Sequence, residues 1–216
     1  MKRRWVFVGL TCTALIGAGI SVQAYRNHRR FAKSAAVYRI RAERGDAKSQ
    51  YALGAMYYYG QGVPKSYVEA ARWYRKSAEQ GNANAQYSLA YIYHDGKGIA
   101  RDDSEAARWC RKAAEQGHGL AQFALAESYR TGVGVPQDNS EAVRWYRKSA
   151  EQGFPQAQYD LGYMYYYGYG VQRDRVQAGD LFQQAAAHGN KDAERAIECD
   201  RKGVSIDPGA GLRGLQ

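Results

Sequence analysis

The side chains best suited to acid–base or nucleophilic chemistry are few and scattered along this chain of 216 residues. The four histidines are His28, His94, His118 and His188, and only His94 has an acidic neighbour in sequence, Asp95. A catalytic base must lie within hydrogen-bond reach of a nucleophile and is oriented by a third group. No stretch of the sequence brings three such groups together, so we expect His94 and Asp95 to contact a ligand rather than to catalyse a reaction.

The cysteines and glycines favour the same interpretation. Cys110 and Cys199 are 89 residues apart in the sequence. Segments similar to the one around Cys110 recur in the chain and have tyrosine or phenylalanine at this position, which is typical of a buried packing thiol. No spacing of His, Cys, Asp or Glu is typical of a metal site, and the recurring Gly-x-Gly follows no predicted strand, unlike a phosphate-binding loop. The sequence therefore predicts no catalytic residue, no metal and no cofactor, and we expect a protein that is not an enzyme.

Most of these side chains, His28 and Cys199 excepted, lie in a segment that the chain repeats four times. Its closing glycine recurs every 36 residues, at Gly81, Gly117, Gly153 and Gly189. The four copies are residues 46–81, 82–117, 118–153 and 154–189. Self-similarity at a fixed period of this size indicates stacked supersecondary units, none of which can bury its apolar face alone.

Each copy predicts two antiparallel helices joined by a turn that glycines mark. In the first copy, Leu53 and Tyr57 are four residues apart, a spacing that places them on one face of a helix. The Gly-x-Gly at 60–62 then ends this helix, because glycine adopts the left-handed conformation at little steric cost. Ser66 is a typical N-cap for a second helix, which contains Trp73.

Positions that agree between copies predict the core. They are Gln50, Gln86, Gln122 and Gln158; Leu53, Leu89, Leu125 and Leu161; Tyr57, Tyr93, Tyr129 and Tyr165; and Trp73, Trp109 and Trp145. Because packing constrains residue type more than solvent does, we interpret these aromatic ladders as core and not as a cofactor site.

The repeated pattern A-x-x-x-L-G-x-x-Y-x-x-G-x-G-V, followed by A-x-x-W-x-x-x-A-x-x-G, resembles the Sel-one-like repeat (SLR), a relative of the tetratricopeptide repeat. The resemblance covers residues 46–189. It implies an all-α fold, a right-handed α-solenoid of antiparallel helix pairs, used as an adaptor or scaffold for other proteins and in bacteria often exported. Some secreted members tie the helices of each copy with a cysteine pair. This sequence lacks those pairs, so the cell-wall or beta-lactam hydrolase activity proposed for some cysteine-rich relatives is the least favoured alternative.

The first helices carry positions that differ between copies beside the constant core positions. Positions 55, 58 and 59 and their equivalents share one face, and in stacked helix pairs the first helices line the concave surface. Specific recognition of a ligand requires residues that vary on such a surface. Tyrosine suits this role because it offers contact area and a hydrogen-bonding group. The predicted binding residues for a partner protein or peptide are Tyr58, Tyr59, Tyr91, His94, Glu127, Arg130, Tyr163, Tyr166 and Tyr167.

Residues 1–24 predict a signal peptide or a transmembrane anchor. Three basic residues precede an uncharged run at 5–24, whose 20 residues are enough to span a bilayer core of about 30 Å. The ending Val22-Gln23-Ala24 fits small-x-Ala cleavage. We favour an uncleaved anchor, because basic residues directly after a cleavage site hinder export.

Residues 25–45 predict a basic juxtamembrane segment and, from about Ser34, a helix that caps the array. Residues 25–44 are expected to lie near anionic lipid headgroups. The first 44 residues hold ten Lys or Arg and one Glu, out of 31 basic and 21 acidic residues in a chain of net charge +10. The array itself is therefore nearly neutral, which argues against a nucleic-acid partner.

Two sequence features bear on which side of the membrane the array lies, and they favour opposite sides. The basic residues that flank the apolar run slightly favour the cytoplasmic face, and the resemblance to exported proteins favours the periplasm. We therefore expect an inner-membrane-anchored or exported periplasmic scaffold, with a membrane-tethered adaptor on the cytoplasmic face as the alternative. Residues 190–202 predict a C-terminal capping helix, and residues 203–216, with four glycines and Pro208, a flexible tail.

Overall fold

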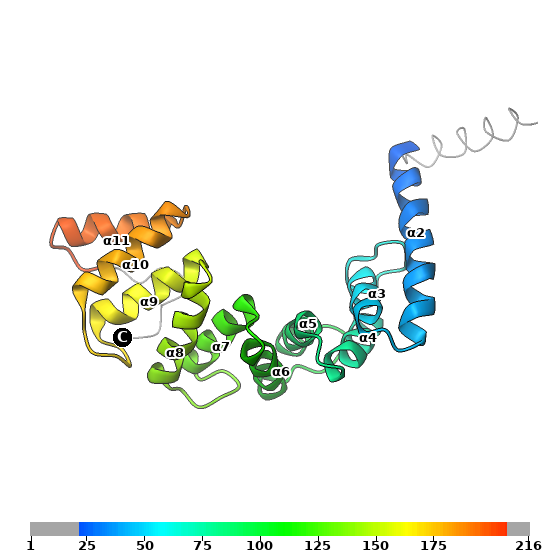
Figure 1. Cartoon of the computed structure of the whole chain (residues 1–216), viewed down its shortest axis with the longest axis horizontal. Helices are drawn as coiled ribbons and strands as arrows, with labels where there is room; N and C mark the ends of the chain where they lie inside the picture. Colours follow the sequence, from blue (N-terminus) through cyan, green and yellow to red (C-terminus); the bar gives the residue numbers. More distant parts are fainter. Residues whose placement is uncertain (1–21, 207–216) are drawn as a thin grey trace, which may run out of the picture. The chain divides into compact units, whose positions relative to one another are not determined.

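The computed structural model describes residues 22–206, and within them the chain forms ten helices and no strand (Figure 1). The predicted all-α array of helix pairs is therefore confirmed. The predicted signal peptide or anchor, residues 1–24, lies outside the described residues except for its last three. Among the described helices, none is both long enough and apolar enough to cross a bilayer. The membrane segment at 5–24 thus stays a prediction.

The chain divides into two compact units, whose described residues are 22–85 with 97–99, and 86–96 with 100–206. The first unit contains α2 (Val22–Glu43), α3 (Ala47–Tyr59) and α4 (Tyr67–Glu79). The second contains α5 (Ala83–Asp95) from Gln86 onward, α6 (Asp103–Glu115), α7 (Gly119–Thr131), α8 (Asn139–Glu151), α9 (Pro155–Tyr167), α10 (Arg175–Ala187) and α11 (Lys191–Arg201).

The second helix of each copy begins at the predicted N-cap. Ser66, Asp102, Asp138 and Asp174 precede α4, α6, α8 and α10, and each side chain accepts a hydrogen bond from a main-chain N–H of the first turn. Such a cap satisfies one of the amide groups that a helix start leaves without a partner. The polar residue that recurs at this offset therefore sets the start of the helix in all four copies.

The two glycines of each Gly-x-Gly have different structural roles. The first ends the helix: Gly132 has a φ of 74°, and its N–H donates to the Ser128 carbonyl of α7. The second, Gly134, lies against the start of α6 in the preceding copy. A Cβ atom on Gly134 would lie 2.6 Å from the carbonyl carbon of Asp103. The sequence-based interpretation of both glycines as helix stops is thus incomplete, because the second allows two main chains to meet.

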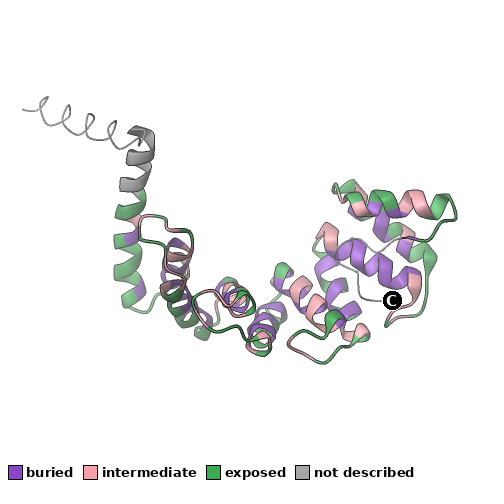
Figure 2. Cartoon of the chain, turned by 180° about the vertical axis from the view of Figure 1, so that it is seen from behind, coloured by how far each residue is buried: buried purple, intermediate pink, exposed green. Residues whose placement is uncertain are grey.

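The constant positions form the core and the contacts between copies, and Figure 2 shows the buried residues along the facing sides of the helices. Leu89 and Leu125 are fully buried, as predicted. The tyrosine ladder is only partly core, since Tyr129 is half-buried and its hydroxyl accepts a hydrogen bond of 2.7 Å from Arg111 of the preceding helix pair. Arg147 donates in the same way to Tyr165, at 2.6 Å.

The two ends of the array differ from their simplest predictions. The predicted capping helix does not begin near Ser34, because α2 is continuous from Val22 and packs against α3. The C-terminal capping helix predicted at 190–202 corresponds to α11, whose N-cap is Asn190. Of the predicted flexible tail, residues 203–206 have no regular structure, yet Ile206 is buried. Residues 207–216 lie outside the described part of the chain.

Candidate functional site

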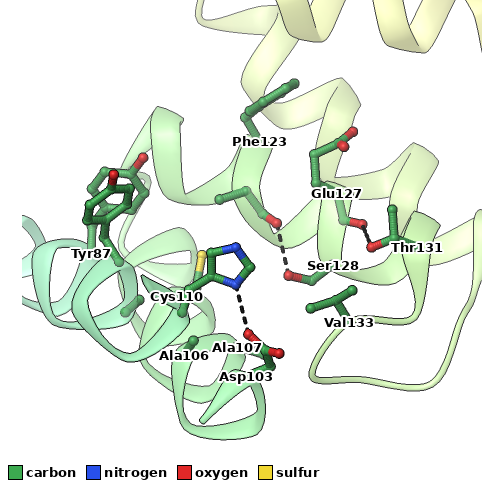
Figure 3. A pocket seen from close by; sticks show the side chains of 14 residues that line it. Tyr87, Asp103, Ala106, Ala107, Cys110, Phe123, Glu127, Ser128, Thr131 and Val133 are labelled. Atoms are coloured by element: carbon green, nitrogen blue, oxygen red, sulfur yellow. Dashed lines mark hydrogen bonds and ion pairs between the residues drawn. The ribbon is translucent and has the colours of Figure 1, made fainter. Parts of the chain in front are cut away.

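A pocket of about 370 Å³ lies within the second unit, between α5, α6 and α7 (Figure 3). Its polar lining includes His94, Asp103, Glu127 and Ser128. Its apolar lining is made of small and aromatic side chains: Tyr87, Ala90, Tyr91, Ala106, Ala107, Cys110, Phe123, Ala124 and Val133. Of the nine predicted binding residues, the pocket brings together three, which are Tyr91, His94 and Glu127.

The pocket exists because Cys110 replaces an aromatic ring. The equivalent residues in the other copies are Tyr74, Tyr146 and Phe182, and all three are buried. Tyr146 packs its ring 5.9 Å from the ring of Phe123, at the place in the third copy that corresponds to the pocket. With a thiol at this position and Ala107 beside it, the pocket between α5, α6 and α7 stays open.

Cys110 itself is unreactive in this position. Its thiol donates a hydrogen bond of 3.2 Å to the Ala121 carbonyl, and burial raises the pKa of Cys110 to about 12. The thiolate is the nucleophilic form of cysteine. The prediction of a buried packing thiol is therefore confirmed. The thiol does not fill the space of the aromatic ring, and a pocket lies beside it.

His94 pairs with an acid that the sequence did not indicate. Its Nδ1 lies 2.8 Å from Oδ1 of Asp103 in α6. Arg101 donates to the same carboxylate, with its Nη2 2.8 Å from Oδ2. Arg101 first, and His94 to a smaller extent, hold the pKa of Asp103 below its usual value, so this wall of the pocket carries a carboxylate.

The hydroxyl of Ser128 and the thiol of Cys110, both in the pocket lining, are hydrogen-bonded to the main chain. Ser128 donates to the Ala124 carbonyl at 3.1 Å, as Figure 3 shows, and Cys110 donates to Ala121. A nucleophile is activated when a base accepts its hydrogen, and here both hydrogens go to main-chain carbonyls. Among residues 22–206, no group of three or more His, Cys, Asp or Glu side chains could hold a metal ion. The arrangement is suited to contact with a ligand.

Arg130 has a structural role that contradicts its prediction as a binding residue. Its side chain is only 4% exposed, and its Nη2 and Nε lie 2.6 and 3.1 Å from the two carboxylate oxygens of Glu127. Nε also donates to the Tyr146 hydroxyl at 3.2 Å, and that hydroxyl donates to Glu127. This network holds the Glu127 carboxylate in place, and its side chain remains 28% exposed.

The tyrosines of the fourth copy are mostly buried. Tyr163 is 2% and Tyr166 6% exposed, and Tyr167 is half-buried. In this arrangement a ligand does not reach Tyr163 or Tyr166, so the structure does not support their prediction as contact residues.

The remaining two predicted residues lie in the first unit. Tyr59 is 66% exposed, and Tyr58 packs edge-on against it with ring centroids 5.0 Å apart. Tyr58 also contacts the ring of Tyr67 at 5.1 Å. These aromatic groups belong to the first unit, and none of them lines the pocket.

Asp160 is a titratable residue that the sequence analysis missed. It is 1% exposed, and Gln156 donates to both of its oxygens, at 3.1 and 3.2 Å. Burial first, and then the negative charge of Glu127, raise the pKa of Asp160 well above its usual value. The equivalent positions of the other copies carry Ala52, Ser88 and Ala124. An acidic residue at a position that otherwise holds small residues is the sequence feature that could have identified Asp160.

Replacement of Asp160 by asparagine is expected to remove a pH dependence of stability. Folded Asp160 keeps its proton while the unfolded chain loses it above about pH 4, so the stabilising effect of the raised pKa is complete below that pH and is lost as the pH rises through the folded pKa. Urea titrations at about pH 4.5 and about pH 8 should show a larger loss of stability in the wild type than in D160N.

The control for the loss of a carboxylate is Asp180→Asn, at an exposed position of α10. It should keep the wild-type pH dependence. If D160N and the wild type lose stability equally between the two pH values, Asp160 is ionised in the folded protein.

Comparison with known proteins identifies the repeat family to which the four copies correspond. The model of the Sel1 repeat matches at residues 47–82, 83–118, 119–154 and 155–190, one residue later in each case than the copies defined from the glycines. No curated protein matches the chain.

Two solved structures resemble it over most of its length. One is a protective antigen of uropathogenic Escherichia coli that has an SLR fold, with 33% identity and a TM-score of 0.77 over 92% of this chain and 42% of that chain. The other is a Sel1 repeat protein from Oxalobacter formigenes, with 32% identity and a TM-score of 0.77 over 86% of this chain and 77% of that one. The chain thus spans less than half the length of the first.

Proposed function

Because the chain belongs to the Sel1 repeat family, whose members generally mediate protein–protein interaction as non-catalytic scaffolds, we propose that its second unit binds an extended segment of a partner protein. The segment would lie along the first helices α5 and α7 and insert one apolar side chain into the pocket beside Cys110. The observation that carries this proposal is the pocket itself, which lies where Cys110 stands in place of the aromatic residue of the other copies.

The lining of the pocket supports an apolar side chain as its occupant. The pocket is lined by Ala106, Ala107 and Ala124 and by the rings of Tyr87 and Phe123. Ligand sites in proteins are of this size, mostly apolar, and oriented by a few polar groups. An aliphatic or aromatic side chain fits the apolar part of this lining better than a polar one, because a polar group would lose its hydration among the alanines without a hydrogen-bond partner.

The polar groups at the sides of the pocket support a peptide as the ligand. Asp103 and Glu127 are hydrogen-bond acceptors from α6 and α7, and both are partly exposed. Main-chain N–H groups of an extended segment are donors of the matching kind. Tyr91 is 45% exposed and adds an amphipathic ring to the same surface. A partner would therefore be held by its main chain and selected by one apolar residue.

The membrane-tethered alternative rests on a different part of the chain. In α2, Val37 and Ile40 are 49% and 52% exposed, and Lys33 and Arg41 are exposed on the same helix. Exposed apolar and basic groups together suit an anionic lipid surface. Contact of this helix with a membrane, and anchoring or export through residues 5–24, remain part of the proposal.

Filling the pocket tests the proposal. Cys110→Tyr places in the second copy the residue that the first and third copies already have, and should weaken binding of pocket-directed peptides at least about tenfold. The measurement is selection of a random peptide library on the wild-type chain, followed by titration of the enriched peptides against both proteins. Cys110→Ala, which keeps the pocket open, is the matched control and should bind like the wild type.

Circular dichroism of the C110Y protein should show unchanged helix content, because Tyr146 occupies the equivalent site in the third copy. If no peptide is enriched, or if the enriched peptides bind C110Y and the wild type equally, the pocket is not the binding site.

A further inference from the structure

The chain turns back on itself after its last helix. Gly203 has a φ of 68°, and the N–H of Val204 donates to the Cys199 carbonyl of α11 at 2.9 Å. This left-handed residue reverses the chain direction at the helix end. Residues 203–206, here called the C-terminal strap, then run to Ile206, which is 2% exposed although Val204 is 55% exposed. The strap therefore attaches through its last residue.

The attachment site is a group of tyrosines on the fourth copy. The Tyr167 hydroxyl donates a hydrogen bond of 2.8 Å to the Ile206 carbonyl. The Tyr167 ring lies 4.8 Å from that of Tyr163, 4.9 Å from that of Tyr166 and 5.8 Å from that of Tyr169. These four residues are here called the tyrosine cluster. Tyr163 and Tyr167 occupy the variable positions at which the sequence predicts ligand contact.

Equivalent tyrosines in other copies are far more exposed. Tyr91 corresponds to Tyr163, and the two are 45% and 2% exposed. Tyr59 corresponds to Tyr167 and is 66% exposed, whereas Tyr167 is half-buried. The fourth copy thus has the aromatic surface of a binding face, but here that surface is covered, and Ile206 is part of the cover.

The contacts of the strap are of a kind that any extended peptide could make. A tyrosine hydroxyl that donates to a main-chain carbonyl does not depend on the residue type, and the aliphatic side chain supplies the selection. Val204 and Ser205 are exposed, and the strap is attached to the tyrosine cluster through the buried Ile206 side chain and the hydrogen bond from Tyr167. The free energy from burying one isoleucine is comparable to the entropic cost of ordering a few residues, so the strap is weakly held.

We propose that the tyrosine cluster is a second peptide-binding site, which the chain's own C-terminal strap occupies. Its ligand is an extended segment that presents an aliphatic side chain in the place of Ile206 and a carbonyl oxygen to the Tyr167 hydroxyl. A partner segment of this kind binds only when it displaces the strap, so the strap reduces the apparent affinity of the site by the fraction of molecules in which the site is free.

A peptide added in trans tests this proposal. The probe is a fluorescently labelled peptide of residues 203–216, and the proteins are the full chain and the chain that ends at Lys202. By fluorescence anisotropy, the shortened chain should bind the peptide, and the full chain should bind it at least about tenfold more weakly. A peptide with Ile206→Asp should lose at least about tenfold in affinity for the shortened chain.

A second variant covers the case in which the shortened chain does not fold. The full-length chain with Ile206→Asp keeps the length of the strap but removes its apolar attachment, and it should bind the wild-type peptide like the shortened chain. Equal binding to the full chain and to both variants, or equal binding of both peptides, would overturn the proposal. Cys110→Tyr should leave peptide binding by the shortened chain unchanged, which separates this site from the pocket in α5–α7.

Discussion

Replacing Gly134 by alanine should lower the free energy of unfolding by about 3 kcal/mol or more. The residue has a φ of 75°, which costs an L-residue about 1 kcal/mol, and its new Cβ would lie 2.6 Å from the carbonyl carbon of Asp103. The start of α6 would have to move away from the turn after α7, a shift that costs about 1–3 kcal/mol in a packed structure. Urea titration followed by circular dichroism measures the change.

Gly153→Ala is the matched control for this experiment. Gly153 has a φ of 82°, but a Cβ there would meet nothing within 4 Å. It should therefore lose only about 1 kcal/mol, the conformational part of the effect. Equal losses in G134A and G153A would show that close approach between copies contributes nothing, and that the second glycine is only a turn residue.

Replacing Arg130 by alanine should lower the free energy of unfolding by about 3 kcal/mol. The guanidinium group is 4% exposed and pairs with both oxygens of Glu127, so its removal leaves that carboxylate without its cation and the Tyr146 hydroxyl without a donor. Breaking a buried ion pair from one side is more destabilising than the pair is stabilising, because the remaining group has already lost its water. The change is again measured by urea titration.

Arg108→Ala removes an ion pair of the same spacing on the surface. Arg108 and Glu105 are 2.6 Å apart, but their side chains are 51% and 34% exposed. Solvent screens such a pair, so R108A should lose no more than about 1 kcal/mol. A loss in R130A as small as that in R108A would mean that Arg130 is available to a ligand, as the sequence analysis predicted, and not part of the core.

The helices could be predicted because local chemistry determines them. The fixed period, the aspartates before α6, α8 and α10 and the glycines after the first helices are signals within a few residues of the ends they set. The role of Gly134 could not be predicted, because its neighbour Asp103 is 31 residues away and belongs to another copy.

The candidate site was harder to predict, because it depends on whether neighbouring side chains fill the space that the missing aromatic ring leaves. Cys110 could be recognised as an exception in an aromatic series, yet a single sequence does not show whether the missing ring leaves a cavity or is replaced by other side chains. His94 and Asp103 come together across the turn between α5 and α6, which a search for adjacent residues overlooks.

The burial of Arg130, Tyr163 and Tyr166 was missed for a related reason. Their helical face was assigned correctly as the variable one, but the sequence pattern says nothing about which other segments cover it. Tyr146 of the next helix covers Arg130, and Ile206, 39 residues after Tyr167, joins the tyrosine cluster. Such contacts decide which residues of a variable face remain accessible.

The most direct test of the account is to locate the bound peptide. A library-selected peptide, titrated into the isotopically labelled full chain, should give intermolecular NOEs between one of its apolar side chains and the methyl groups of Ala107, Ala124 and Val133. These NOEs should be absent with C110Y. NOEs confined to the exposed face of α6 and α8, with none to the three pocket methyl groups, would contradict the claim that the space beside Cys110 receives the partner.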